Sequence, residues 1–481
     1  MVSMEEEDGW AAFEAWTNRD KEEDEQTSGY RRPSWTVVSK GHQHDHFFSN
    51  RADSFAELGA PERLVDNLAK LGVYQPSISQ ASSYETILRG DDCVINHAAG
   101  TGKSLAFIAP LIHKLWEWED EHGRTPPGEV RAIIIVPTPE LGQQVLAMAR
   151  EVASRSIRAS IATGEHSWQT QRQRTAGGLD LLVATMGRLI ALVAPRDTEP
   201  SFSLSGTRAL VVDEADSLYQ GENSGWLERH PGGRGRGRGE DYQEPPVAMW
   251  KWLRSELPSE CHTTLATASL SDSVEKAMRE DVPGLRVVRG RGVHTTRPGV
   301  STTLVDCSLP RLLEDGTSSL FEAKLEELLT ALDQGEPTFR TLILCNGAAT
   351  CDRLARALRA ALDSSDYRIL RFHASLQPEQ RSAYLDTFRE PKADGVRRVL
   401  VATGRASKGL SFSTDLTGDD GVGHVVLFEY PPDVKAYIAR VGSATRGTAA
   451  PARVTALAVG KQLSFAKAML SQDEVGEAHR L

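Results

Sequence analysis

A glycine-rich stretch, His97 to Ser104, constrains the fold of this chain more than any other feature. It follows four strand-like residues, Cys93–Asn96, and a helix-like stretch begins at its lysine. The glycines would let backbone N–H groups wrap around a phosphate, and a helix N-terminus would add its dipole. The pattern therefore predicts a strand–loop–helix unit that binds a nucleoside triphosphate, although a glycine-rich turn without a ligand is the simpler alternative. The residues expected at the phosphates are Gly100, Thr101, Gly102, Lys103 and Ser104, with the serine hydroxyl on Mg²⁺.

A second motif begins at Val211 and Val212 and continues into the tetrad Asp213–Asp216. Consecutive apolar β-branched residues fit a strand covered on both faces, and open α/β sheets bind ligands at the carboxyl ends of such strands. Asp213 would hold Mg²⁺ through water, and Glu214 would orient or deprotonate an attacking water. Alone, the tetrad fits an acidic strand-to-helix turn equally well. Together with the glycine-rich loop, it predicts a nucleotide–Mg²⁺ site.

Composition narrows the class of protein. A chain of 481 residues should form two or three domains, and no stretch approaches the roughly 18 apolar residues of a membrane span. The net charge of −11 argues against nucleic-acid binding by bulk charge but leaves room for a local basic groove. Five cysteines without a CxxC pair indicate reduced, intracellular thiols. The acidic N-terminus resembles neither a secretory signal nor a transit peptide, so we expect a cytoplasmic or nuclear protein, or an organellar one if a targeting segment precedes this sequence.

Short apolar runs alternate with helical stretches at βα spacing along most of the chain, which predicts doubly wound parallel sheets with right-handed crossovers. A Gly/Arg-rich insertion at 221–246 is either a weak RNA contact or a solvated flexible loop. Three histidines at 42, 44 and 46 form either a metal site or a solvated run. We expect a disordered acidic arm at 1–50, a first α/β domain at 51–288, a linker at 289–300, a second α/β domain at 301–470 and a tail at 471–481.

The motifs around the nucleotide site resemble those of the DEAD-box RNA helicases of superfamily 2. The family's tetrad is present letter for letter at Asp213–Asp216, and Pro76–Gln80 stands where Pro-Thr-x-Ile-Gln is expected. Phe55 precedes Gly72 by the usual seventeen residues. The resemblance implies two RecA-like domains in tandem and ATP as the nucleotide. Gln80 would then hydrogen-bond the adenine edge and Phe55 would stack on the ring, although Gln80 alone also fits a helix N-cap contact.

Other first-domain motifs match the family's RNA contacts. Pro137–Gln144 resembles Pro-Thr-Arg-Glu-Leu-Ala-x-Gln with Pro139 in place of the arginine, and Thr185–Arg188 matches with one substitution. Thr267 and Ser269 keep the hydroxyls of Ser-Ala-Thr and would couple the tetrad to domain closure by hydrogen bonds near Asp216. The family's RNA contacts read backbone shape and not base sequence. The residues that the resemblance places on RNA are Thr138, Gly164, Thr185, Arg188, Arg381 and Thr403.

The second-domain motifs are less faithful to the family. In Ala402–Ser411, which stands for Ala-Thr-Asp-x-x-x-Arg-Gly-x-Asp, both aspartates are gone, replaced by Gly404 and Ser411. In Tyr437–Arg446, which stands for Tyr-x-His-Arg-x-Gly-Arg-x-x-Arg, alanine replaces the histidine and Ser443 replaces the middle arginine. By resemblance, the γ-phosphate would meet one arginine finger, Arg446, instead of two. The remaining second-domain residues expected at the nucleotide are Gly409, Ser411 and Arg440.

Three functions fit this pattern. The first is an ATP-dependent RNA helicase that binds RNA backbone without sequence preference and couples ATP hydrolysis to local duplex unwinding or to remodelling of RNA–protein complexes. The second, motivated by the eroded second domain, is an RNA clamp or assembly factor that binds ATP and hydrolyses it little. The third is a nucleotide-switched protein scaffold without an RNA role, which the retained RNA-contact motifs disfavour. Expected ligands are ATP, Mg²⁺ and single-stranded or short duplex RNA, with protein cofactors as further partners and no membrane.

Overall fold

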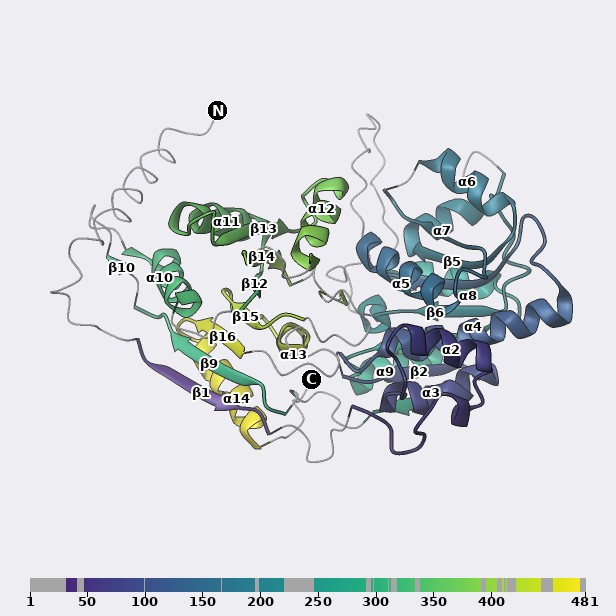
Figure 1. The fold of residues 1–481 in the computed structure, drawn as a ribbon, viewed down its shortest axis with the longest axis horizontal. Coiled ribbons are helices and arrows are strands. Elements are labelled where there is room, and N and C mark those ends of the chain that lie inside the picture. Colours follow the sequence, from purple (N-terminus) through teal and green to yellow (C-terminus); the bar gives the residue numbers. More distant parts are fainter. Residues whose placement is uncertain are drawn as a thin grey trace.

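Two seven-stranded sheets organise the chain into two α/β domains that lie side by side (Figure 1). The computed structural model describes residues 32–40, 47–98, 100–165, 167–194, 199–219, 246–290, 296, 298–309, 311–312, 318–333, 338–390, 395–404, 409–410, 412, 421–442 and 453–475. The histidine run at 42–46 and the insertion, apart from residue 246, lie outside these residues.

The first sheet has the order β4-β5-β3-β6-β7-β2-β8, and all its pairings are parallel. Its strands are β2 (Cys93–Asn96), β3 (Val130–Val136), β4 (Ala159–Ala162), β5 (Leu179–Thr185), β6 (Ala209–Val212), β7 (His262–Thr267) and β8 (Arg286–Arg289). Its helices are α2 (Glu62–Lys70), α3 (Ile78–Leu88), α4 (Lys103–His122), α5 (Pro139–Val152), α6 (Trp168–Ala176), α7 (Met186–Val193), α8 (Pro246–Glu256) and α9 (Asp272–Asp281), with short 3-10 turns at Ala56–Leu58 and Ala215–Tyr219.

Alternate residues of the central strands pack into two separate cores, which explains why the strands are apolar throughout. In β3, Ile134 joins a cluster with Leu111 of α4. Its neighbour Ile133 joins a second cluster with Leu189 of α7 and Trp250 of α8. Successive side chains of a strand point to opposite faces, so a sheet with helices on both faces needs an uninterrupted apolar run.

The second sheet has the order β1-β9-β16-β15-β12-β14-β13 and repeats this architecture. Its strands are β1 (Ser34–Val38), β9 (Ser301–Asp306), β12 (Arg340–Cys345), β13 (Tyr367–Phe372), β14 (Arg397–Thr403), β15 (His424–Leu427) and β16 (Arg453–Ala458), beside a small pair, β10 (Arg311–Leu312) and β11 (Ser318–Ser319). Its helices are α10 (Leu320–Asp333), α11 (Ala348–Ala361), α12 (Pro378–Arg389), α13 (Val434–Gly442) and α14 (Gln462–Val475).

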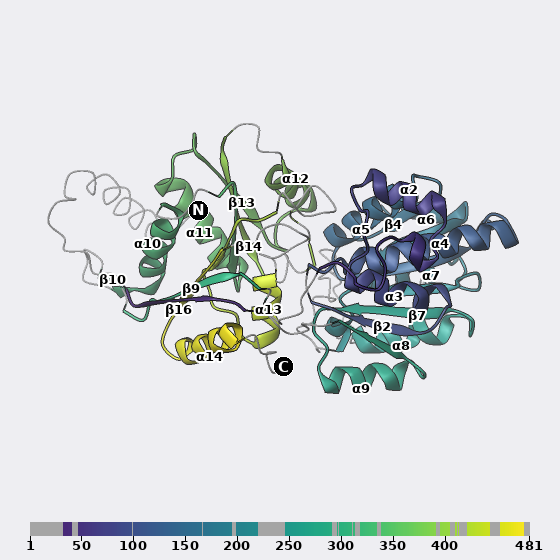
Figure 2. The same cartoon turned by 60° about the horizontal axis from the view of Figure 1, so that its bottom comes forward.

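The N-terminal segment corrects one expectation, because residues expected in a disordered arm form strand β1 of the second sheet. Ser34–Val38 pairs antiparallel with β9, and Figure 2 shows the two strands running together next to α14. The run Trp-Thr-Val-Val has high β-propensity, and the edge of β9 gives its backbone groups partners. The chain then returns to the first domain, where Ile78 N donates to Phe47 O at 3.0 Å. Residues before the first domain therefore bind both domains.

Two domain boundaries also shift. Helix α14 runs to Val475, because Tyr437 donates a 2.6 Å hydrogen bond to the buried carboxylate of Asp473, so the tail does not begin at 471. Strand β8 includes Arg289, which pairs with Asn96 of β2, so the linker does not begin at residue 289. Both errors arise where a tertiary partner extends an element past the end of its apolar pattern.

Truncation through residue 40 should destabilise the second domain by about 2–5 kcal/mol, because each lost hydrogen bond contributes roughly 0.5–1.5 kcal/mol and the edge of β9 becomes exposed. Urea unfolding followed by circular dichroism would measure the loss. Truncation through residue 31 leaves β1 in place and should behave like the full chain. Equal stability of the two truncated chains would show that β1 contributes nothing to the second domain.

Candidate functional site

The nucleotide motifs meet at one edge of the first sheet because they follow neighbouring strands. Strands β6, β7 and β2 are adjacent and parallel, so their carboxyl ends lie side by side. The tetrad follows β6, Thr267 ends β7, and the glycine-rich loop follows β2. A 3.3 Å hydrogen bond from His97 N to Thr267 O joins the glycine-rich loop to the end of β7. The sheet thus assembles three motifs that are far apart in the sequence.

Left-handed backbone at Gly100 and Gly102, with φ of 81° and 80°, shapes the loop. A Cβ on Gly102 would lie 2.5 Å from Gln80 Nε2, so a side chain there would displace the glutamine. The ammonium of Lys103 bends back over the loop and donates to the carbonyls of His97 at 3.0 Å and Ala98 at 2.9 Å. The lysine is therefore already held against the concave backbone that the sequence predicts as a phosphate cradle.

The His97 side chain packs against Ser82 of α3 and Gly290, the residue after β8. Its Nε2 lies 3.4 Å from Ser82 Oγ, and its ring packs so closely under Gly290 that a Cβ on that glycine would overlap it. Burial, reinforced by Lys103, lowers the pKa of His97 to about 3, so the ring is neutral at pH 7. The unusually large residue at this position fills a gap between α3 and the end of β8.

Gln80 makes the contacts of a helix cap. Its Oε1 accepts from Ser77 N at 2.8 Å while Ser77 Oγ accepts from Gln80 N, which is the reciprocal capping box of α3. Its Nε2 donates to Gly102 O at 3.4 Å, and Ser77 Oγ donates to Thr101 O at 2.8 Å. The N-cap alternative thus describes its side chain, and the same contacts fasten α3 to the glycine-rich loop.

The ring of Phe55, expected to stack on adenine, is buried in this structure. Phe55 is 1% exposed and packs edge-on against Tyr84, with ring centroids 6.4 Å apart. The stacking role of Phe55 therefore stays a prediction. The spacing that suggested the role is preserved, but the local packing decides what the ring touches.

The tetrad combines burial with an unusual backbone. Glu214 is 6% exposed and has a φ of +52°, a left-handed conformation that costs a non-glycine residue about 1–3 kcal/mol and clusters at functional sites. Its N–H donates to Asp213 Oδ1 at 2.9 Å, and Ser217 Oγ donates to its carbonyl at 2.5 Å. These hydrogen bonds hold the turn that directs both carboxylates to the edge of the sheet.

The hydrogen bonds predicted near Asp216 are present. Thr267 Oγ1 donates to Asp216 Oδ1 at 2.8 Å, and Ser269 Oγ donates to Oδ2 at 3.0 Å. Two hydroxyls therefore satisfy both oxygens of a carboxylate that is almost fully buried. The same loop contacts the glycine-rich loop through Thr267 O, so the three motifs form one connected unit.

Replacing Thr267 by valine and Ser269 by alanine should reduce RNA unwinding far more than ATP turnover. The change removes two donors from a buried carboxylate, at about 1–3 kcal/mol each, without touching Lys103 or Glu214. Steady-state ATPase and short-duplex displacement, measured on one preparation, would test this. Ser273→Ala, an exposed serine in the first turn of α9, should leave both activities unchanged. Equal loss of the two activities would contradict a coupling role.

The second domain reaches the tetrad. A Cβ on Gly409, whose φ is +76°, would lie 3.4 Å from Glu214 Oε1 and 3.0 Å from Leu141 Cδ2. Leu410 and Leu141 belong to one buried apolar cluster that spans both domains. Helix α12 faces α5 across the domain boundary in Figure 1, and there Arg389 donates to Gln144 Oε1 at 3.3 Å. The site therefore includes groups from both sheets.

Two arginines are placed differently from the sequence-based expectation. Arg381, expected on RNA, is 13% exposed and pairs with the first-domain carboxylates of Glu140 and Glu165. Arg440, expected at the nucleotide, is 7% exposed and donates to Glu429 O at 2.8 Å and Asn346 Oδ1 at 2.6 Å. Burial lowers the pKa of the Arg440 guanidinium.

The lost aspartate at position 404 accounts for the inward position of Arg440. A Cβ on Gly404 would lie only 2.6 Å from Arg440 Nε, so the guanidinium packs directly on the glycine. An aspartate there would push this side chain away. The departure from the family pattern at position 404 is thus linked by packing to the position of Arg440.

Ser411 and Arg446 lie outside the described residues, so their roles stay predictions.

The expected RNA-contact residues of the first domain occupy the other half of the same sheet edge. Thr138 caps α5 after β3 by accepting from Leu141 N at 3.3 Å, Gly164 is exposed after β4, and Thr185 ends β5. Arg188 lies in the first turn of α7, and Thr403 ends β14 of the second sheet. Strands β4, β5 and β3 are consecutive, which separates these residues from the nucleotide motifs on β6, β7 and β2.

Sequence reasoning missed Trp168, which lies beside Arg188. The guanidinium carbon of Arg188 is 4.5 Å from the centre of the tryptophan ring. The available signal was an aromatic residue four positions after Gly164 in an otherwise polar stretch. It also missed Glu140 and Glu165 as partners of Arg381, because such pairs form only when the domains meet.

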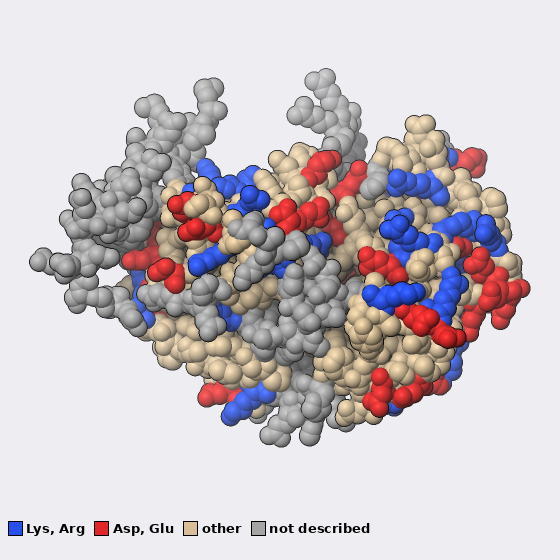
Figure 3. Space-filling model, viewed as in Figure 1, with Lys and Arg blue, Asp and Glu red and all other residues tan. Residues whose placement is uncertain are grey.

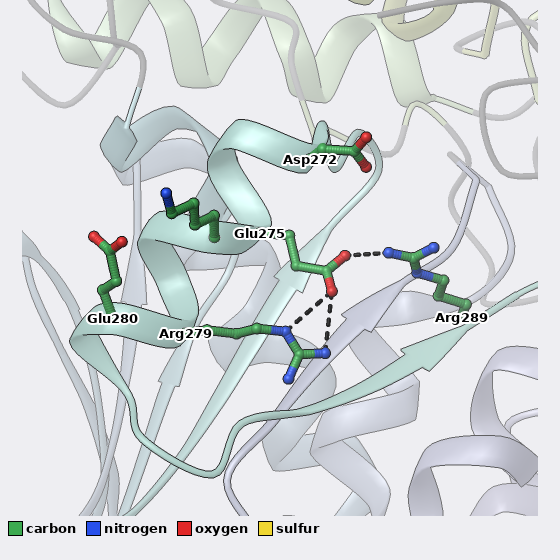
Figure 4. A pocket seen from close by; sticks show the side chains of 6 residues that line it. Asp272, Glu275, Arg279, Glu280 and Arg289 are labelled. Carbon is green, nitrogen blue, oxygen red and sulfur yellow. Dashed lines mark hydrogen bonds and ion pairs between the residues drawn. The ribbon is translucent and has the colours of Figure 1, made fainter.

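Surface charge is mixed over both domains, as Figure 3 shows for one face. A surface pocket of about 440 Å³ beside α9 and β8 is lined by Asp272, Glu275, Lys276, Arg279, Glu280 and Arg289 (Figure 4). Within it Glu275 pairs with Arg289 and, at 3.0 Å, with Arg279, which lowers the Glu275 pKa despite partial burial. These ion pairs tie α9 to the end of β8, and none of the lining residues belongs to the predicted site.

Cysteine placement agrees with the sequence, since all five thiols are buried and free. In the part of the chain that the structure describes, no helix is long and apolar enough to cross a membrane. The same residues contain no group of three or more His, Cys, Asp or Glu side chains arranged to hold a metal ion by themselves.

Comparisons with known proteins agree with these motifs. Residues 77–231 match the DEAD/DEAH box helicase family model, and residues 323–448 match the helicase conserved C-terminal domain. DEAD-box ATP-dependent RNA helicase 50 of Oryza sativa subsp. japonica is 32% identical over 468 residues, which are 94% of this chain and 67% of the relative. The protein of the same name from Arabidopsis thaliana is 31% identical, over 89% of this chain and 51% of its own length.

Solved structures share the fold. Dbp5 of S. cerevisiae, bound to RNA and ADP BeF3, superposes with a TM-score of 0.65 at 18% identity, covering 88% of this chain and 94% of its own. The DEAD-box helicase Mss116, bound to ssRNA and UDP-BeF, superposes with a TM-score of 0.67 at 16% identity, covering 88% of this chain and 78% of its own. The expected fold class, two RecA-like doubly wound domains in tandem, is confirmed. The chain belongs to the DEAD-box family of ATP-dependent RNA helicases.

Proposed function

We propose that this chain hydrolyses ATP between its two domains and uses the cycle to open short RNA duplexes or to remodel RNA–protein complexes without reading base sequence. The observation that carries this proposal is the approach of Gly409 to Glu214, since a Cβ on that glycine would lie 3.4 Å from Glu214 Oε1. A second-domain residue thus lies near the expected catalytic carboxylate, so the completeness of the site depends on how the domains meet. Domain closure around bound ligands would therefore control hydrolysis.

The residues at the loop and the tetrad suit a nucleotide with Mg²⁺. The Ser104 hydroxyl and the Asp213 carboxylate are hard oxygen donors of the kind that Mg²⁺ prefers. When bound, Mg²⁺ neutralises negative charge that develops on the transferred phosphoryl group. Lys103, whose ammonium now donates to two loop carbonyls, would exchange these acceptors for phosphate oxygens. Glu214 would orient the attacking water and accept its proton, and Arg446 would stabilise charge on the γ-phosphate.

RNA would lie along the other half of the sheet edge and continue onto the second domain. Thr138, Gly164, Thr185 and Arg188 of the first domain and Thr403 of the second offer hydroxyl, amide and guanidinium groups to the sugar–phosphate backbone. Contacts of this kind fix position without specifying sequence. RNA bent across both domains would not fit a straight duplex, so closure would pry a short duplex apart locally. Hydrolysis and reopening would then release the strand.

The erosion of the second domain favours a second candidate, an ATP-dependent RNA clamp or assembly factor with little turnover. Arg440 is packed on Gly404 and bonded to Asn346, so its guanidinium is occupied within its own domain. The motif then retains one arginine, Arg446, that could act as a finger on the γ-phosphate. In this candidate ATP would close the domains on RNA, and slow hydrolysis would keep them closed.

ATP turnover measured with and without single-stranded RNA separates the candidates. For a helicase, we expect RNA to raise turnover and ATP to drive displacement of a short duplex. Tight ATP-dependent RNA binding, combined with turnover that RNA does not raise, would identify the clamp. Failure to bind RNA in the presence of a non-hydrolysable ATP analogue would contradict both candidates.

A further inference from the structure

We propose that the exposed face of Trp168 stacks an unpaired base of the bound RNA, so that the first domain holds one base ring as well as the backbone. This inference rests on the RNA binding proposed above and adds a base contact to it. Trp168 is the first residue of α6 and follows the loop that carries Gly164. Helices α6 and α7 lie on the same side of the first sheet in Figure 1, and their N-termini approach one another at Trp168 and Arg188.

One face of the ring is already used. The guanidinium of Arg188 lies over it, 4.5 Å from the ring centre, and Arg188 itself is buried. The residue nevertheless remains 46% exposed, which leaves the opposite part of the indole open to solvent. A cation beneath an aromatic ring fixes the orientation of the ring, so the open surface is held ready for a flat partner.

Helix α6 does not need this ring for its own attachment. Ser167 caps it by accepting from Thr170 N at 3.2 Å. Gln171, which is buried, donates from Nε2 to Thr163 O at 2.6 Å and so fastens the helix to the end of β4. Buried Thr175 supplies the next turn on the same face. A large apolar ring left in solvent beside a helix anchored by polar contacts is better explained by a ligand than by packing.

The surroundings of the ring favour a nucleic-acid base as that ligand. Arg188, expected on the RNA backbone, contacts the ring, and exposed Gly164, expected there too, precedes it by four residues. Every base presents a flat π-surface to an aromatic ring. The nearby carboxylate of Glu165 is paired with Arg381 and accepts from Gln143, so its charge is compensated. A stacked base must be unpaired on that face, and this would favour single-stranded over duplex RNA at this end of the site.

Trp168→Ala should weaken binding of a labelled single-stranded RNA to the full chain, with a non-hydrolysable ATP analogue present, by about 5- to 150-fold in anisotropy titrations. Trp168→Phe should retain most of the affinity because a phenyl ring also stacks. Trp35→Ala is the matched control. Trp35 belongs to β1 of the second domain, is 37% exposed, and lies under the ammonium of Lys467 from α14. Its loss should leave RNA binding unchanged.

An abasic scan separates stacking from a structural role. When one abasic nucleotide is moved along the RNA, the wild-type chain should lose affinity at one particular position, and Trp168→Ala should lose that position dependence. Unchanged RNA affinity of Trp168→Ala, as expected if the ring docks a protein instead, would overturn the inference. A weakened variant with an unaltered scan would also overturn it, since the ring would then only order Arg188. Absence of RNA binding by the wild-type chain would overturn both this inference and the proposed function.

Discussion

Glu214→Gln should lower ATP turnover about 10²- to 10⁴-fold while ATP still binds, because glutamine keeps the shape of the side chain but cannot accept a proton. The carboxylate is buried and lies at a left-handed turn held by hydrogen bonds from Glu214 N to Asp213 and from Ser217 to Glu214 O. The isosteric change should leave that turn intact. RNA binding in the presence of ATP should persist longer than in the wild type, since hydrolysis no longer reopens the domains.

Steady-state turnover, ATP affinity and RNA release rates would be measured on the same preparations. Glu151→Gln, the same change at an exposed position near the end of α5, should have no effect on any of them. A wild-type turnover as low as that of Glu214→Gln would mean that the carboxylate is not used as a base. The clamp would then be the better description of this chain.

Arg446→Ala should lower turnover about 10³- to 10⁵-fold, the usual contribution of an arginine finger in phosphoryl transfer. The expectation comes from the register of the motif, in which Arg446 keeps the last arginine and Ser443 replaces the middle one. For the same reason, Ser443→Arg should raise turnover by restoring a second cation.

Both variants would be compared in single-turnover ATP hydrolysis at saturating RNA, with Lys461→Ala as an exposed charge control. A small loss in Arg446→Ala would argue that another group stabilises the γ-phosphate. No gain in Ser443→Arg would mean that a different departure, such as Gly404 with Arg440 packed on it, limits the rate.

The phosphate loop and the tetrad were predictable because each is a local pattern tied to the end of a strand. Glycines at 100 and 102 permit left-handed backbone, and the valines before Asp213 match a strand buried on both faces. The pairing of Thr267 and Ser269 with Asp216 was also within reach, because neighbouring parallel strands end at the same edge. Such inferences use only periodicity, backbone sterics and sheet topology.

Other positions depended on partners far away in the chain. Phe55 has the expected spacing, but its ring is in the core against Tyr84. Arg440 lies against Gly404 because the family's aspartate is missing there, and Arg381 finds Glu140 only when the domains meet. No pattern within one segment shows where a long side chain will find its counter-charge.

The sequence by itself determined two tandem α/β domains, a glycine-rich loop and an acidic tetrad at the carboxyl ends of β2 and β6, and membership of the DEAD-box family, since backbone conformation and burial follow from local residue types. The tertiary structure alone decided that β1 joins the second domain, that Gly409 comes near Glu214, and that Trp168 remains partly exposed beside Arg188. Each of these depends on which surfaces meet in space, and the free energy of such contacts is shared between segments that do not neighbour one another in the chain.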